Sequence, residues 1–97
     1  MSTLDAYKTE LAALLEVFGA NVRRIRGTQR PYCSQERLAH ATRLHRTEIG
    51  RIEQAAVEPR LSTLVILADG LSVGVEELLD GVWVPQERRP ASSNQWQ

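Results

Sequence analysis

The sequence predicts an all-α domain of five or six helices, and three observations lead to that prediction. Apolar residues recur at the three- and four-residue spacing of helices along most of the chain. Apart from the short run at residues 82–84, no period-two alternation of useful length occurs. Prolines and several glycines fall between the periodic stretches. With 97 residues, of which 42% are apolar, the chain has room for one modest core.

The first predicted element is a long amphipathic stripe from about Thr3 to Arg26. Its apolar members are Leu4, Leu11, Leu14, Leu15, Phe18, Val22 and Ile25. Ser2, followed three residues later by Asp5, is similar to the capping box that starts many helices. Gly19 lies inside the stripe, and a break at this glycine would divide the stripe into two helices. The expected number of helices is therefore five or six. Gly27 and Pro31 end the stripe, and a surface loop follows.

Two short helices joined by a tight turn are predicted in the middle of the chain. The first runs from about Gln35 to Thr42, with Ser34 as a favourable N-cap. The second runs from about His45 to Gln54. Ala39 is placed where the two helices touch, because only a small side chain lets them cross closely.

This helix pair has an apolar inside and a polar, arginine-rich outside. The inward positions are Leu38, Leu44, Ile49 and Ile52. The outward positions are Arg46, Thr47, Glu48 and Arg51. Each inward side chain contributes about 1.5–3 kcal/mol to folding if fully buried. A small helical pair of this kind is suited to placing its second helix in the major groove of DNA.

Two further helices are predicted, from Leu61 to Leu71 and from Val75 to Asp80, with Gly74 as a possible cap for the last. The polar, Pro- and Ser-rich tail that follows is expected to be disordered. The predicted organisation is a helical extension over residues 1–17, a domain over residues 18–81 and a tail over residues 82–97.

The net charge is zero, but the charge is unevenly distributed along the chain. Residues 18–60 hold nine arginines against four glutamates, a net charge of +5. Residues 61–81 hold four acidic residues and no basic one. Phosphate affinity depends on the local field rather than on the total. Eleven of the twelve cations are arginines, which suit bidentate contacts to phosphate or guanine.

Several classes of protein are disfavoured. No run approaches the roughly 18–20 apolar residues of a membrane span, and the N-terminus has no signal-peptide pattern. The single Cys33 excludes an internal disulfide framework, so we expect a cytoplasmic protein. The spacing of Cys33, His40 and His45 matches no common zinc pattern. No phosphate loop or nucleophile elbow occurs, so neither a cofactor nor an enzymatic activity is expected.

Residues 18–79 resemble the helix-turn-helix domain of phage Cro/repressor and XRE-like transcription regulators. FGANVRRIR is similar to the first helix of this family, and SQERLA matches its frequent Ser-Gln-x-x-Leu-Ala. HRTEIGRIE corresponds to the recognition helix, EPRLSTL to the proline-led fourth helix and LSVGVEELL to the last helix. The resemblance implies a sequence-specific transcriptional regulator, more often a repressor. It further implies a homodimer on an inverted repeat in double-stranded DNA, with half-sites about 34 Å apart.

The resemblance also implies roles for individual residues. Arg46, Thr47 and Arg51 match base-contacting positions, and Glu48, on the same face, accepts from a cytosine amino group or only orients Arg51. The expected phosphate contacts are Gln35, His45 and Arg60, with Arg23, Arg37 and Arg43 as weaker candidates. Arg26 and Glu53 match positions of a structural ion pair that links the first and third helices in some phage repressors.

Four features depart from the family pattern or lack an explanation. Arg43 and Ala55 stand where glycine is usual, so each is strained if the backbone keeps a left-handed conformation there. The loop before Gln35 is about two residues longer than the commonest form, which leaves its docking open. Gly50, in the middle of the recognition helix, lowers helix stability by about 1 kcal/mol relative to alanine. Its missing side chain allows another group to approach the backbone closely.

Two questions remain open from the sequence. The apolar stripe over residues 4–15 and the run Val82, Trp83 and Val84 are both candidate dimer seams. The same features favour an alternative function, in which an XRE-like domain serves as an antitoxin or co-regulator that binds a partner protein. The operator, the sign of regulation and any effector are not encoded in a recognisable pattern.

Overall fold

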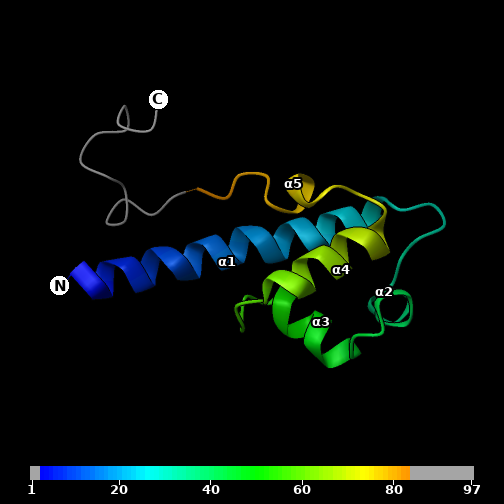
Figure 1. The fold of residues 1–97 in the computed structure, drawn as a ribbon, viewed down its shortest axis with the longest axis horizontal. Coiled ribbons are helices and arrows are strands. Elements are labelled where there is room, and N and C mark those ends of the chain that lie inside the picture. The colour runs from blue at the N-terminus through cyan, green and yellow to red at the C-terminus, as the bar shows by residue number, and fades with distance from the viewer. Residues whose placement is uncertain (1–2, 84–97) are drawn as a thin grey trace.

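A computed structural model describes residues 3–83, and the fold is all-α, as predicted (Figure 1). Its helices are α1 (Thr3–Thr28), α2 (Gln35–Thr42), α3 (Arg46–Glu53), α4 (Leu61–Leu71) and α5 (Val75–Leu78). Figure 1 shows α1 as a long spine, with the other helices gathered around its C-terminal half. None of the helices within residues 3–83 is both long and apolar enough to cross a membrane.

The first helix continues without a break through Gly19, so the possible division into two helices does not occur. The reason is tertiary contact. A Cβ atom at Gly19 would lie 2.5 Å from the carbonyl oxygen of Ile52 and 2.9 Å from that of Glu53. Glycine therefore lets the end of α3 approach the backbone of α1. The helix also passes Gly27, which was expected to end it, and stops at Thr28.

The core lies where the five helices meet. Its fully or almost fully buried members are Phe18, Val22 and Ile25 of α1, Leu38 of α2, Ile49 and Ile52 of α3, Leu67 and Leu71 of α4, and Leu78 of α5. The predicted inward positions of the helix pair therefore lie inside, although Leu44 is only half-buried at the edge of the core. Ala39 also packs against this core.

The α2–α3 turn keeps a left-handed residue despite the lack of glycine. Arg43 has φ 62° and ψ 19°, in the region that costs a non-glycine residue about 1 kcal/mol or more. The hydroxyl of Thr42 accepts a hydrogen bond from the Leu44 amide at 3.3 Å and donates to the Leu38 carbonyl at 2.7 Å. These bonds hold the chain through the turn. Ala55 is likewise left-handed, with φ 59°.

Helix α2 begins at the predicted N-cap, since the Ser34 hydroxyl accepts a hydrogen bond from the Arg37 amide at 3.0 Å. The long loop between α1 and α2 is docked at both ends. Gln29 Nε2 donates to the Leu71 carbonyl at 3.2 Å, and Arg26 Nη1 donates to the Cys33 carbonyl at 3.1 Å. Cys33 itself is buried, and this burial raises the pKa of its thiol.

The chain after α4 returns along α1. Asn21 Nδ2 donates to the carbonyls of Leu78 at 2.9 Å and Asp80 at 2.7 Å, and α5 ends at Leu78 rather than at the expected Asp80. Val82 packs against the core, and Trp83 Nε1 donates to Glu10 Oε1 at 2.8 Å. The first two residues of the predicted tail thus pack on α1, without forming a strand. Ser2 and residues 84–97 lie outside the described residues, and the predicted boundary after residue 17 falls within α1.

A buried ion pair joins α1 to the end of α3. Arg26 Nε lies 2.8 Å from Glu53 Oε2, and Arg26 Nη2 lies 2.9 Å from Glu53 Oε1, a bidentate arrangement. The exposed fractions of the two side chains are 7% and 4%. The hydrogen bond to Glu53 raises the pKa of the Arg26 guanidinium well above its ordinary value, so the pair strongly favours the charged form of Arg26. This is the pair expected from the family resemblance.

Substituting Gly19 tests the close approach of α1 and α3. We expect Gly19→Ala to lower the free energy of unfolding by about 1–3 kcal/mol, because the methyl group would collide with backbone atoms that cannot rotate away. Guanidinium unfolding followed by circular dichroism measures the change. Gly27→Ala is the matched control, since a Cβ there meets nothing within 4 Å. Equal stability of the two variants would contradict the steric role of Gly19.

Removing one member of the ion pair tests its structural role. We expect Glu53→Ala to cost about 3–5 kcal/mol of folding free energy, because it leaves the buried guanidinium of Arg26 unpaired. Glu36→Ala is the control, because Glu36 takes part in an ion pair whose side chains are 63% and 73% exposed and should cost at most about 1 kcal/mol. An unchanged melting temperature for Glu53→Ala would show that the buried pair is not structural.

Candidate nucleic-acid interface

The side of α3 that faces away from the core carries the residues predicted to read bases. Arg46, Thr47 and Arg51 are exposed, whereas Glu48 is half-buried. Arg46 Nη1 lies 3.0 Å from Glu36 Oε1 in an ion pair on the surface. An exposed pair of this kind contributes little to stability, so a stronger anion can displace Glu36 at small cost.

An open hollow of about 400 Å³ lies on the outer side of α3, and we call it the outer hollow. It is lined by Gln35, Arg46, Thr47, Gly50, Arg51 and Gln54. The start of α2 and one face of α3 thus meet at the same depression. Gln54 was not predicted as a site residue, although its spacing of four residues from Gly50 and eight from Arg46 places the three on one helical face.

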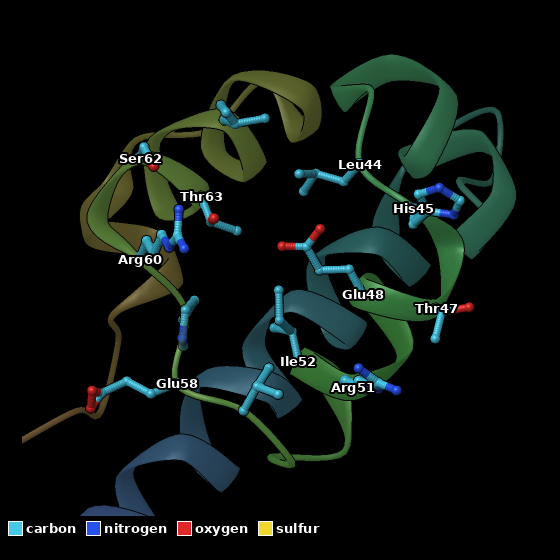
Figure 2. A pocket seen from close by; sticks show the side chains of 13 residues that line it. Leu44, His45, Thr47, Glu48, Arg51, Ile52, Glu58, Arg60, Ser62 and Thr63 are labelled. Atoms are coloured by element: carbon cyan, nitrogen blue, oxygen red, sulfur yellow. The ribbon is translucent and has the colours of Figure 1, made fainter.

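A second depression, of about 610 Å³, separates α3 from the start of α4, and we call it the α3–α4 groove (Figure 2). Glu48 extends from α3 into this groove in the direction of Arg60 and Thr63, whereas Thr47 and Arg51 point to the outer side of the helix (Figure 2). Glu48 lines only this groove, while Thr47 and Arg51 line both depressions. The four predicted base-reading residues therefore do not form a single row.

Gln35 connects the surface to the buried ion pair. Its Nε2 donates a hydrogen bond to Glu53 Oε1 at 3.0 Å. Because an ionised carboxylate only accepts hydrogen bonds, the nitrogen of the amide must face Glu53 and the oxygen must face away. Consistent with this, Gln35 Oε1 is the atom nearest to a Cβ built on Gly50, at 4.0 Å. The core pair thus fixes the orientation of a side chain in the outer hollow.

The predicted phosphate contacts are divided between the two depressions and the surrounding surface. His45 is the N-cap of α3, with no side-chain capping bond, and Arg60 is the N-cap of α4; both are exposed and line the α3–α4 groove. Arg23, Arg37 and Arg43 are exposed but line neither depression. Arg37 Nη1 donates a long hydrogen bond of 3.5 Å to the Tyr32 carbonyl.

The charged residues, which are unevenly distributed along the sequence, are also unevenly distributed over the structure. Figure 1 shows α5 on the opposite side of α1 from α3. Helix α5 and the residues just after it carry Glu76, Glu77 and Asp80, all exposed, with Arg24 nearby. Three of the four acidic residues of the segment 61–81 therefore lie away from the outer face of α3, and this separation favours binding of an anionic partner on the α3 side.

The helical fold agrees with comparisons to known proteins. Residues 17–80 match a family described as a helix-turn-helix domain. The chain is 44% identical over 64 residues to "Control protein C.SmaI" of Serratia marcescens, a match that covers 66% of this chain and 74% of that protein. No solved structure gives a significant match. The chain therefore belongs to the helix-turn-helix family of DNA-binding transcription regulators.

Proposed function

We propose that this protein is a control protein that regulates transcription of a restriction–modification gene set and that it acts as a repressor. The proposal rests on the similarity to a protein named as a control protein, together with the exposed polar face of α3. That face presents two arginines and a threonine on a short helix whose opposite side is fully buried. Such regulators work on DNA in the cytoplasm, which we propose as the location of this one.

In the proposed complex, α3 enters the major groove and its outward side chains contact base edges. Arg46 and Arg51 suit guanine, whose two acceptors match a guanidinium, and each such contact provides about 1–3 kcal/mol of discrimination. Thr47 contacts a base through its hydroxyl or its methyl group. Glu48 accepts from a cytosine amino group at the edge of the α3–α4 groove or orients Arg51.

Phosphate contacts from both sides of α3 would position the helix in the groove. Gln35 lies at the start of α2, and its orientation is held by Glu53. His45 and Arg60 flank the α3–α4 groove, from the starts of α3 and α4. Arg23, Arg37 and Arg43 add a more distant positive field. These contacts supply affinity without sequence information.

We further propose that the protein binds an inverted repeat as a homodimer through the exposed face of α4. Leu61 is 75% exposed and Val65, one turn later, is 51% exposed. Ile66, beside Val65 in the sequence, is 38% exposed. Large exposed apolar side chains at neighbouring positions mark interaction surfaces. Of the two seams predicted from the sequence, the run that contains Val82 and Trp83 is less available, because these two residues pack within the same chain.

The alternative is that the protein binds a partner protein, as an antitoxin or co-regulator does. The long N-terminal half of α1, which extends beyond the other helices, favours this possibility (Figure 1). Selection of bound sequences from random duplexes at a stated salt concentration separates the two. Enrichment of an inverted repeat supports the proposed function, and enrichment of no motif supports the interaction module.

Alanine substitutions on α3 and α4 test the assignment of contacts. We expect Arg46→Ala and Arg51→Ala to relax base preference at particular operator positions, because each removes a bidentate contact worth about 1–3 kcal/mol. Arg60→Ala should weaken binding to all sequences similarly and reduce the slope of log K against log salt by about 1. Titrations of specific and random duplexes across a salt series measure both effects. Equal losses on both duplexes for the α3 variants would contradict base reading.

Substituting Val65 tests the proposed dimer surface. We expect Val65→Glu to convert a dimer into a monomer, because burying four carboxylate oxygens across a two-fold interface without partners is strongly unfavourable. Sedimentation equilibrium of the wild type and the variant measures the change. Ala20→Glu, at an exposed position on α1, is the control and should remain dimeric. A monomeric wild type, or a dimeric Val65→Glu, would rule out this surface.

A further inference from the structure

Gly50 occupies a position at which the fold itself does not require glycine. It lies in the middle of α3, where glycine is less favourable than every ordinary residue except proline. A Cβ at Gly50 would meet only Gln35 Oε1, at 4.0 Å, which is ordinary van der Waals contact. Gly19 and Gly70 are different, since a Cβ at either would lie 2.5 Å from an atom of another helix. Packing within the chain therefore explains those two glycines but not Gly50.

The surroundings of Gly50 point to a ligand outside the chain. Gly50 lines the outer hollow, with Arg46 one turn before it and Gln54 one turn after it on the same face of α3. A side chain at position 50 would project into the space that these residues surround. The missing side chain thus keeps the outer hollow open on the side of α3 that faces away from the core.

The chemistry of the outer hollow favours an anion that accepts hydrogen bonds. Two guanidinium groups, those of Arg46 and Arg51, line it, and no carboxylate does. The amide of Gln54 adds hydrogen-bond donors. Gln35 donates one N–H to Glu53 and turns its amide oxygen toward Gly50, so on its side the outer hollow presents an acceptor. Among the groups of double-stranded DNA, the phosphate matches the two guanidinium groups, because it is negatively charged.

We propose that Gly50 is a positioning residue that keeps the outer hollow open for one phosphate group of the DNA backbone. The absent side chain lets that strand approach the backbone of α3 closely enough for the phosphate to enter the outer hollow. This inference rests on the proposed function, since it concerns how the same face of α3 meets DNA.

Filling the outer hollow tests the inference. We expect Gly50→Ala to raise the melting temperature by several degrees, since alanine is the better helix former, and yet to weaken DNA binding. The loss should be on the order of tenfold at 0.1 M salt, similar on specific and random duplexes, with the salt slope reduced by about 1. Gly50→Leu should bind more weakly still. The measurements are thermal melts and duplex titrations across a salt series.

The matched controls are Gly27→Ala and Gly27→Leu, because Gly27 is helical, exposed and has open space around its Cα but lies outside the outer hollow. They should leave both affinities unchanged. Wild-type affinity in Gly50→Leu would overturn the inference, and so would a loss confined to the specific duplex, which would assign the outer hollow to a base. If the wild type itself enriches no sequence and binds no duplex, the proposed function fails and the inference fails with it.

Discussion

The buried pair of Arg26 and Glu53 is the interaction on which the rest of the structure depends. It joins α1 to the last residue of α3 with two hydrogen bonds under 3 Å. The remaining guanidinium nitrogen holds the α1–α2 loop through the Tyr32 hydroxyl and the Cys33 carbonyl. Each of the two charges compensates the desolvation of the other, so neither is tolerable alone. The pair fixes three segments of the chain relative to one another.

The pair also links the core to the surface that we propose to contact DNA. Glu53 accepts a third hydrogen bond, from Gln35, which sets the orientation of an amide in the outer hollow. The recognition helix is therefore supported by buried, well-paired groups on one side. On the other side, the contact of Arg46 with Glu36 is exposed and easily exchanged. A rigid support with weakly held outer side chains suits a helix that must offer its arginines to a nucleic acid.

Departures from the usual glycine pattern show how the protein distributes backbone strain. Arg43 and Ala55 adopt left-handed conformations that glycine would adopt more readily, each at a cost of about 1 kcal/mol. Ile49 and Ile52 are fully buried in the helix that joins these two turns, and their burial stabilises the fold by more than the strain costs. Glycine is instead used at Gly19, where backbone meets backbone. The glycine thus stands where α1 and α3 pack backbone to backbone, whereas the two turns keep strained non-glycine residues.

The sequence by itself determined the helical class and the bounds of α2 and α4, because periodicity and the cap at Ser34 are local properties of neighbouring residues. The pairing of Arg26 with Glu53 was also predictable, but only through the family resemblance. The tertiary structure decided that α1 runs unbroken through Gly19 and that Glu48 turns into the α3–α4 groove. It also brought Gln35 of α2 to the outer hollow beside Gly50 of α3. These features depend on how closely the helices approach one another and at what angle, which no single segment of sequence specifies.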